Sequence, residues 1–296
     1  TDALSQRDSG GIQLFAETNQ EALDLHIQAF KLAEELSLPV MVCMDGFILT
    51  HAYERVDMPD QAQVDAYLPP YEPRQVLDPK EPVSIGAMVG PEAFMEVRYL
   101  AHVKQMQALE RIPELATEFQ KIFGRDSGGL CHCYQCEDAD TIIVAMGSVL
   151  GTIKDVIDEM RAAGHRIGAL GITTFRPFPS ARVRLALQGA KRVVVLEKSI
   201  AIGLGGIVAT NIRTALSALP IHVFTVVAGL GGRAITARSL QGLFEKAEKE
   251  DLDEVSFLDL NHELVDKHLA REKESRRTGP AAEAMLRDLG VVAAKI

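Results

Sequence analysis

The stretch TDALSQRDSGGIQLFAETNQEALD, from Thr1 to Asp24, decides how the rest of the chain is understood. It places a lone arginine, Arg7, in a polar, glycine-containing turn before an apolar strand predicted over Ile12 to Phe15, and a helix follows directly. An arginine can bind a carboxylate through two parallel hydrogen bonds, which a lysine cannot do. Arg7 is therefore a candidate anion-binding residue. The alternative is an exposed pair with Asp8, which would contribute little.

The next elements predict an α/β region over residues 1–55. An apolar stripe with helical spacing runs through Asn19 to Leu36. Val40 to Met44 is then a short apolar run of the kind found in buried parallel strands. The predicted stripe consists of Leu23, Ile27, Phe30, Ala33 and Leu36.

Polar residues follow the end of the second predicted strand. Catalytic groups in parallel sheets gather at the carboxyl ends of strands, which makes this position a candidate site. The residues concerned are Asp45, Gly46, Thr50 and His51. The alternative is purely structural, with a capping aspartate and a partly buried histidine.

Seven prolines interrupt the segment from Val56 to Pro91. Because proline removes a backbone donor and fixes φ, this segment is predicted to be an extended linker. It could wrap a neighbouring subunit or form a tethered surface loop. Glu92 to Phe123 is predicted to be mostly helical, with Pro113 in the first turn of a second helix. Residues 56–137 together form the predicted linker and helical connector.

Three thiols and an imidazole lie within six residues: Cys131, His132, Cys133 and Cys136. Zinc prefers sulfur and nitrogen ligands in a tetrahedral arrangement, so a metal site is one hypothesis. The run lacks the second Cys-x-x-Cys pair of a zinc ribbon and the fourth cysteine of an iron–sulfur loop. We therefore favour a run without a metal.

Strand and helix patterns alternate over residues 138–260, which is typical of a parallel sheet covered by helices. Ser148 is predicted to cap the first helix of this region, and Pro179 to stand at the start of the second. The predicted strands are Thr141 to Met146, Arg166 to Ile172, Arg192 to Leu196, Ile221 to Val227 and Val255 to Leu258; the other helices cover Ile207 to Ala218 and Ala237 to Glu250.

Two glycine clusters interrupt this region, Gly203 to Gly206 and Gly229 to Gly232, the second followed by Arg233. A helix N-terminus with free amides can hold phosphate, so either cluster could contact a phosphate group or CoA. Neither has the spacing of a dinucleotide-binding motif, and we favour close packing of turns or contact with a partner subunit, both of which glycine permits.

The totals exclude several classes of protein. The 296 residues suggest roughly two domains, and the net charge of −10 argues against a dominant nucleic-acid role. No run of about 18 apolar residues predicts a membrane span, and the start has no signal-peptide pattern. Four cysteines do not indicate a disulfide framework, so we expect the cytoplasm. Residues 261–296 are predicted to be a helical tail, with a mixed-charge face from His268 to Arg277 and a last helix from Pro280 to Leu289.

Five stretches, taken in order, resemble the pyruvate:ferredoxin oxidoreductase family: the opening stretch, VMVCMDGFILTHAYE (40–54), CEDADTIIVAMGS (136–148), FRPFP (175–179) and AGLGGRAIT (228–236). The resemblance implies the C-terminal part of the domain that receives the pyrimidine side of thiamine diphosphate, followed by a domain similar to the C-terminal domain of transketolases. It also implies that Arg7 contacts the carboxylate of the 2-oxo acid. About a hundred residues of the family are expected upstream, including the acid that protonates the aminopyrimidine.

What the resemblance implies for function is a subunit of a 2-oxoacid:ferredoxin oxidoreductase, with pyruvate as the first choice of substrate. Thiamine diphosphate with Mg²⁺ and [4Fe–4S] clusters would be held mainly by partner subunits, CoA would accept the acyl group, and ferredoxin would receive the electrons. The alternatives are action on oxalate or another 2-oxo acid, a β-type subunit of a 2-oxoacid dehydrogenase, and a non-catalytic assembly module.

Overall fold

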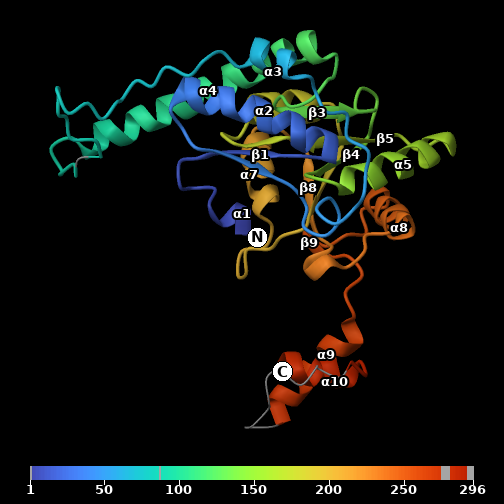
Figure 1. Cartoon of the computed structure of the whole chain (residues 1–296). Helices are drawn as coiled ribbons and strands as arrows, with labels where there is room; N and C mark the ends of the chain where they lie inside the picture. The colour runs from blue at the N-terminus through green and yellow to red at the C-terminus, as the bar shows by residue number, and fades with distance from the viewer. Residues whose placement is uncertain (1, 87, 275–280, 292–296) are drawn as a thin grey trace. The chain divides into compact units, whose positions relative to one another are not determined.

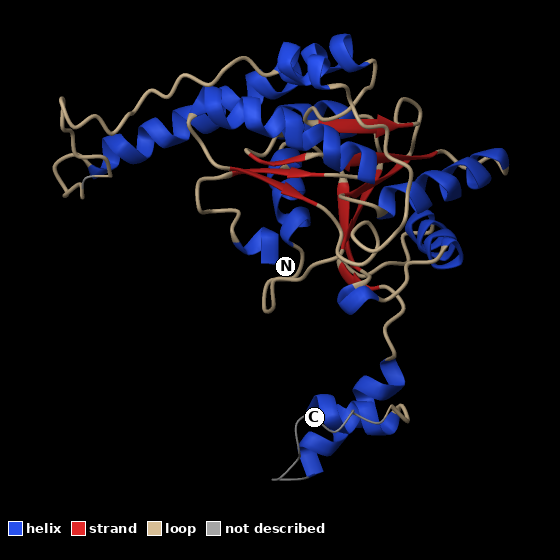
Figure 2. Ribbon diagram, in the orientation of Figure 1, coloured by secondary structure: helices blue, strands red, loops and turns tan. Residues whose placement is uncertain are grey.

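The computed structural model describes residues 2–86, 88–274 and 281–291. The chain divides into a large unit, residues 1–256, and a small unit, residues 257–296. Figure 1 labels the elements, and Figure 2 separates the helices from two sheets in the large unit.

The first sheet has three strands in the order β2-β1-β6, of residues Val40–Cys43, Ile12–Phe15 and Thr174–Arg176. β1 and β2 are parallel, with Ile12 opposite Val40, as expected. The expected burial of the second strand is wrong, because β2 lies at the edge of this sheet and only Cys43 of its residues is buried. β6 is antiparallel to β1 and comes from a distant part of the sequence, the FRPFP segment, where only a turn was predicted. A segment more than 150 positions away therefore completes this sheet.

Helix α2, Asn19–Leu36, has the predicted bounds. The side chain of Thr18 accepts a hydrogen bond from the amide of Glu21, which caps the N-terminus. The predicted apolar stripe is wrong at Phe30, whose side chain is 62% exposed, whereas Leu25 and Leu32 are buried. The buried face is rotated because α2 packs against both β2 and the long helix α4, Phe94–Phe123.

Helix α4 is continuous through Pro113, so the prediction of two helices is wrong. Buried side chains on both sides of the proline, among them Ile112 and Leu115, keep the helix straight enough to pack on α2. Tertiary packing thus outweighs the loss of one helical hydrogen bond. The N-terminal half of α4 and the extended segment before it project away from the sheets (Figure 1). The short helix α3, Gln61–Tyr67, packs on α4.

The second sheet has six strands in the order β3-β5-β4-β7-β8-β9. The pairs β4–β5, β4–β7 and β7–β8 are parallel, as the alternating pattern predicted. Helices α6 and α7 pack on the face to which Ile142 and Val144 point, and α5 and α8 pack together beside β4 and β5. The strands are β3 (Cys131–Tyr134), β4 (Thr141–Ala145), β5 (Ile167–Ile172), β7 (Arg192–Glu197), β8 (His222–Val227) and β9 (Val255–Phe257); the helices are α5 (Val149–Ala162), α6 (Ser180–Leu187), α7 (Ile207–Leu216), the 3₁₀ turn η1 (Leu230–Gly232) and α8 (Ala237–Glu248).

Strand β3 was not predicted, because the sequence analysis assigned the cysteine run to the connector. It is an edge strand, antiparallel to β5, with Cys131 opposite Ile172. A short edge strand with polar residues leaves no apolar alternation in the sequence, which explains the missed assignment.

The small unit contains α9, His262–Glu274, and α10, Ala281–Asp288. The short helix α1, Asp2–Ser5, belongs to the large unit. Asp288 pairs with Arg271 at 2.9 Å and with Lys267 at 3.1 Å, which joins the two helices. The last helix was predicted within one residue at its C-terminal end. The parts of the tail prediction that involve Arg276, Arg277 and Pro280 lie outside the described residues.

Candidate functional site

Arg7 lies in the turn between α1 and β1, as predicted. Its Nη1 donates a hydrogen bond to the carbonyl of Leu4 at 3.0 Å, and its Nε lies 3.5 Å from Asp8. The side chain of Arg7 is 30% exposed and that of Asp8 is 74% exposed. A pair this long and this exposed holds an arginine only weakly, so the guanidinium keeps donors for another acceptor.

A second arginine, Arg176 of the FRPFP segment, fixes the backbone of this turn. Its Nε donates to the carbonyl of Arg7 at 3.1 Å, and its Nη1 donates to Asn211 of α7 at 3.2 Å. Its Nη2 also lies 3.7 Å from Asp8. Burial and the nearby charge of Arg7 lower the pKa of Arg176, while Asp8 opposes this shift. The two guanidinium groups share one exposed carboxylate, so the turn carries a local excess of positive charge.

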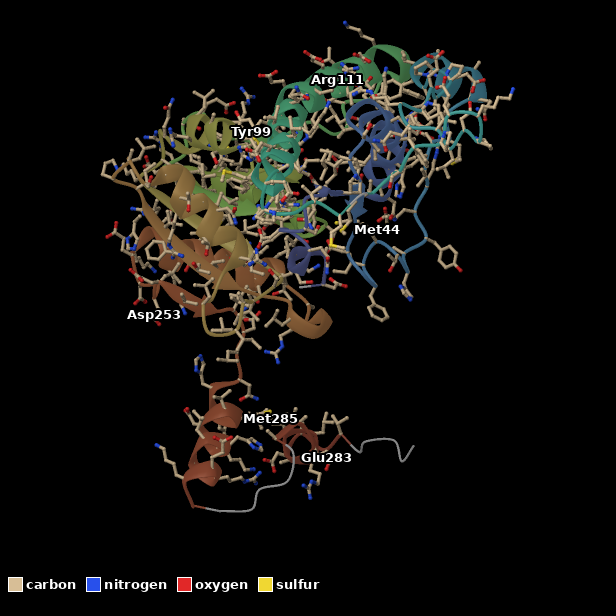
Figure 3. All side chains as sticks on the ribbon, turned by 90° about the vertical axis from the view of Figure 1, so that its left-hand side faces the viewer. Met44, Tyr99, Arg111, Asp253, Glu283 and Met285 are labelled. Carbon is tan, nitrogen blue, oxygen red and sulfur yellow. The ribbon has the colours of Figure 1, made fainter. Side chains whose placement is uncertain are left out.

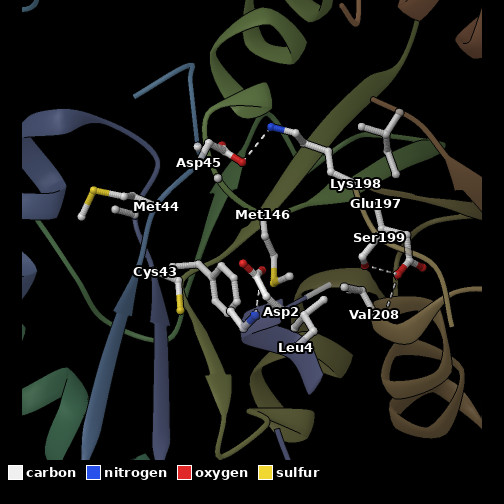
Figure 4. Close-up of a pocket in the computed structure, with 16 residues that line it drawn as sticks. Asp2, Leu4, Cys43, Met44, Asp45, Met146, Glu197, Lys198, Ser199 and Val208 are labelled. Atoms are coloured by element: carbon white, nitrogen blue, oxygen red, sulfur yellow. Dashed lines mark hydrogen bonds and ion pairs between the residues drawn. The ribbon is translucent and has the colours of Figure 1, made fainter. Parts of the chain in front are cut away.

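A cavity of about 300 Å³ lies where the carboxyl ends of strands from both sheets meet. Its walls include the ends of β1 and β2, the end of β4 at Met146 and the end of β7 at Glu197. Figure 4 shows these side chains converging, with Asp45 facing Lys198. Arg7 is not among the residues that line this cavity.

Asp45 joins the two sheets instead of facing the cavity freely. Its Oδ1 accepts a hydrogen bond from Lys198 at 2.7 Å, and its Oδ2 accepts one from the amide of Ser148 at 2.6 Å. Burial alone would raise the pKa of Asp45, but these hydrogen bonds outweigh burial and lower it. The predicted Ser148 cap is wrong, because the Ser148 side chain makes no cap bond and Asp45 binds the start of α5. The structure thus favours the structural alternative for Asp45.

Glu197 plays the same part for helix α7. Its buried carboxylate accepts hydrogen bonds from the amides of Ile207, Val208 and Ala209 at 2.7 to 3.2 Å. Burial raises the pKa of Glu197, and the three amides limit the rise. This helix N-terminus is therefore already neutralised by a carboxylate of the protein itself.

The structure does not support phosphate binding by the glycine cluster before α7. The cluster from Gly203 to Gly206 leads into that helix, whose first amides bind Glu197 and not an external anion. Gly206 makes room for Glu197, since a Cβ atom there would collide with Glu197 Oε1. The same Cβ atom would also lie 2.6 Å from Thr225 Cγ2. The second cluster forms the 3₁₀ turn η1, with Gly229, Gly231 and Gly232 at positive φ, so these glycines satisfy the backbone of the turn.

The remaining candidates after β2 lie on an exposed loop. His51 is exposed and stacks on Phe47 at 4.6 Å between ring centroids, so the expected partial burial of His51 is wrong. Its Nδ1 lies 2.9 Å from Thr50 Oγ1, and Gly46 lines the cavity. The structure brings Gly46 to the cavity and leaves Thr50 and His51 outside it.

The cysteine run does not converge on one point. The His132 ring bonds the carbonyl of Gly128 at 2.6 Å, and Cys136 Sγ bonds the carbonyl of Ala169 at 3.0 Å. Among the described residues, no group of three or more His, Cys, Asp or Glu side chains is arranged to hold a metal ion.

Thiamine diphosphate does not fit the residues of this chain alone. The aminopyrimidine needs an acid and the diphosphate needs a metal, yet each acid that lines the cavity is engaged within the protein: Asp2, Asp45 and Glu197. The described part of the chain also offers no metal-binding cluster.

Comparisons with known proteins identify the family. Residues 1–117 match the family model described as pyruvate flavodoxin/ferredoxin oxidoreductase, thiamine diphosphate-binding, and residues 139–240 match core domain II of pyruvate:ferredoxin oxidoreductase. The chain is 42% identical over 273 residues to pyruvate synthase subunit PorA of Methanosarcina barkeri, covering 89% of this chain and 68% of that protein. The chain belongs to the α-subunit family of the 2-oxoacid:ferredoxin oxidoreductases.

Other members of this family are similar over the same region. PorA of Pyrococcus furiosus is 45% identical over 254 residues, covering 84% of this chain and 64% of that protein. The ketoisovalerate oxidoreductase subunit VorA of Pyrococcus horikoshii is 37% identical over 253 residues, again covering 84% and 64%. The chain therefore spans about two thirds of the length of these curated relatives.

A solved structure supports the fold of this 2-oxoacid:ferredoxin oxidoreductase subunit. A 2-oxoglutarate:ferredoxin oxidoreductase from Magnetococcus marinus superimposes with a TM-score of 0.53 at 16% identity, covering 79% of this chain and 42% of that chain. The expected α/β class is confirmed. In the described part of the chain, no helix combines the length and apolar character needed to cross a bilayer.

Proposed function

We propose that the chain is the α-type subunit of an enzyme that oxidatively decarboxylates a 2-oxo acid, with pyruvate as the first choice. The similarity to pyruvate synthase subunits carries this proposal, because identity of 42% and 45% extends over 89% and 84% of the chain. In the reaction, a 2-oxo acid, CoA and two oxidised ferredoxins yield acyl-CoA, carbon dioxide, two reduced ferredoxins and a proton.

Arg7 is proposed to bind the carboxylate of the 2-oxo acid. Three observations support this role: its guanidinium is accessible, its pair with Asp8 is weak, and Arg176 holds its backbone. A carboxylate could accept two parallel hydrogen bonds from such a guanidinium, which fixes the orientation of the substrate as well as its position.

Other subunits are proposed to supply the redox groups. Thiamine diphosphate, held with Mg²⁺ largely by a partner subunit, would stabilise the carbanion that forms when carbon dioxide leaves. [4Fe–4S] clusters in further subunits would carry single electrons to ferredoxin. We also place the complex in the cytoplasm, a reducing compartment that suits the four unpaired cysteines.

The test is CoA-dependent reduction of a viologen dye by the natively purified complex under anaerobic conditions, with a panel of 2-oxo acids. Pyruvate is expected to be the best substrate. Arg7→Ala is expected to raise the KM for that acid roughly ten- to hundredfold, since a hydrogen bond to a charged group is worth about 1.5–3 kcal/mol. Thiamine content should not change.

Arg55→Ala is the matched control, because the Arg55 side chain is 90% exposed and pairs with the exposed Asp57. Its KM should equal that of the wild type. Unchanged KM in Arg7→Ala would defeat the role of Arg7. No reduction with any acid, from a complex that retains thiamine and iron, would instead favour an assembly role for the chain.

A second substrate class has its own support. Similarity to VorA at 37% identity makes a branched 2-oxo acid the runner-up. The same panel separates the two, since a preference for 2-oxoisovalerate over pyruvate would reverse the assignment. Oxalate belongs in the panel as the other substrate that the sequence resemblance left open. Membership of this family argues against a β-type subunit of a 2-oxoacid dehydrogenase.

A further inference from the structure

The segment Cys133-Tyr134-Gln135-Cys136 forms a sharp turn at the end of strand β3. Gln135 adopts a positive φ of 57°, which reverses the chain directly after the strand. The turn lies between Cys133 and Cys136, so the two cysteines stand at Cys-x-x-Cys spacing on either side of it. Two cysteines at this spacing form the arrangement of redox-active Cys-x-x-Cys motifs.

The turn is braced by neighbouring elements. The hydroxyl of Tyr134 donates to Asp158 of α5 at 2.8 Å, and Arg161 of α5 donates to the carbonyl of Gln135 at 2.7 Å. On the other side, the carbonyl of Gln135 lies so close to Gly168 of β5 that a Cβ atom would collide with it. The thiols can therefore change state while the backbone around them stays in place.

The two thiols differ in environment. Cys133 is exposed, whereas Cys136 is partly buried and bonds the carbonyl of Ala169 at 3.0 Å. Interaction with the neighbouring Cys136 lowers the pKa of Cys133 to about 7, with Arg182 assisting and burial and Glu137 opposing. The same interaction and burial raise the pKa of Cys136. An accessible thiolate beside a protonated partner is the arrangement of an attacking and a resolving cysteine.

We propose that Cys133 and Cys136 form a redox-active dithiol that low-molecular-weight disulfides oxidise. The Cys133 thiolate attacks one sulfur of the small disulfide, forms a mixed disulfide and releases one small thiolate. Cys136 then loses its proton, attacks Cys133 Sγ and releases the second small thiol. The small disulfide is reduced by two electrons, and the protein dithiol is oxidised by two.

The other two cysteines are poor competitors for this chemistry. Cys43 is buried, and burial raises its pKa to about 11. Burial and the neighbouring Cys133 raise the pKa of Cys131 to about 11 as well. Both remain protonated near neutral pH, where a thiol is a weak nucleophile.

The test exposes the reduced, purified chain to oxidised glutathione without oxygen and then counts free thiols and measures the intact mass. The wild type is expected to lose two of its four thiols and a mass of two hydrogens, with no glutathione attached. Cys136→Ser is expected to stop at a glutathione adduct. Cys133→Ser should keep its three thiols, and Cys131→Ser should oxidise like the wild type.

The variants are needed because Cys131, Cys133 and Cys136 lie on one tryptic peptide, residues 126–154. Four free thiols in the wild type after treatment would overturn the proposal, and so would normal oxidation of Cys133→Ser. Loss of oxidation in Cys131→Ser would move the disulfide to another pair. As a second readout, removal of Cys133 should abolish a phase of iodoacetamide labelling at least about tenfold faster than the rest at neutral pH. None of these outcomes depends on the proposed enzymatic function.

Discussion

Single glycines decide whether a carboxylate can reach the start of a helix in this fold. Gly147 precedes α5, and a Cβ atom there would lie 2.6 Å from Asp45 Oδ2. Gly206 precedes α7, and a Cβ atom there would collide with the carboxylate of Glu197. Both glycines therefore make space for an acid that binds backbone amides.

Gly206→Ala tests this steric argument. The backbone at Gly206 has φ −76° and ψ 135°, which alanine adopts without strain, so any effect comes from the added methyl group. We expect the free energy of unfolding to fall by about 1–3 kcal/mol, measured by urea denaturation of the purified chain. Gly189→Ala is the matched control, since a Cβ atom there meets nothing within 4 Å. Equal stability of the two variants would show that Glu197 has room to move.

Arg176 is the second residue to test, because it holds the turn that presents Arg7. In Arg176→Lys the Nε donor to the carbonyl of Arg7 is lost. We expect the KM for the 2-oxo acid to rise about tenfold while the KM for CoA stays constant, since a misplaced binding group weakens only its own contact. Steady-state kinetics of the complex measure both constants.

Arg184→Lys is the control, because Arg184 also donates its Nε to a carbonyl, that of Ala215 on α7 at 2.8 Å, and not to the turn that carries Arg7. A rise in both KM values, or a similar loss in the control variant, would indicate general damage to the fold and no specific link to Arg7.

At the scale of elements, one carboxylate connects β2 with α5 and β7. Asp45 follows β2, while its partners Ser148 and Lys198 follow β4 and β7. The two sheets are thus joined where the carboxyl ends of their strands meet, at the cavity. This connection is electrostatic, so it depends on pH.

Asp45→Asn is expected to reveal that dependence. The folded state lowers the pKa of Asp45 below its ordinary value of 3.8, so the ionised carboxylate stabilises the fold above that pH. The contribution disappears as pH falls through the lowered pKa. The variant should lose about 1–3 kcal/mol of unfolding free energy near neutral pH, and the deficit should shrink towards about pH 3. Denaturant unfolding across this range measures it.

Asp57→Asn provides the comparison, since Asp57 is 63% exposed and pairs with an exposed arginine. Its stability should follow that of the wild type at every pH. A constant deficit of Asp45→Asn from neutral to acid pH would mean that the lost contact is not the ionic one.

At the scale of the whole molecule, one projecting segment of the large unit, here called the arm, exposes many apolar side chains. The arm comprises residues 69–86 and 88–106, the extended segment and the first half of α4. In Figure 3, Tyr99 and Arg111 mark the projecting and the packed half of that helix. The exposed apolar side chains of the arm are Tyr71, Val76, Leu77, Val83, Ile85, Met88, Phe94, Met95, Val97, Tyr99, Leu100 and Met106. A protein does not expose so large an apolar surface without a partner, so we expect another subunit of the complex to cover it.

The double variant Met95→Ser/Leu100→Ser tests the arm. Both side chains are exposed, at 77% and 63%, so the stability of the purified chain should change by less than about 0.5 kcal/mol. Assembly with the partner subunits, followed by native mass spectrometry, should weaken. Leu185→Ser on α6, where the side chain is 56% exposed, should assemble normally. Normal assembly of the double variant would leave the arm without a role in the complex.

Local signals in the sequence predicted local structure well. The bounds of β1 and α2 were predicted correctly, because an apolar run and a threonine cap act within a few residues. The errors concern long-range contacts. Phe30 is exposed because α2 packs on α4 as well as on the sheet, and Ser148 is not the cap because Asp45 arrives from 103 positions earlier.

The candidate site was predicted in the same uneven way. Arg7 was identified from its position before β1, but Arg176 was missed because its contact with Arg7 spans 169 positions. Proximity of this kind leaves no mark in one sequence. The signal that could have suggested it is the FRPFP segment itself, which places an arginine between aromatic rings and prolines.

Because strand β6 completes the sheet of β1 and β2, the chain cannot be cut between the two regions without exposing β1. A chain cut after residue 137 would keep β1 and β2 but lose Thr174–Arg176, the neighbour of β1 on its other side. β1 would then expose unpaired amides and carbonyls along a buried, apolar strand, which is a template for aggregation. Expression of the N-terminal part by itself should therefore give inclusion bodies, and functional complementation by two separately produced halves should require their synthesis in the same cell.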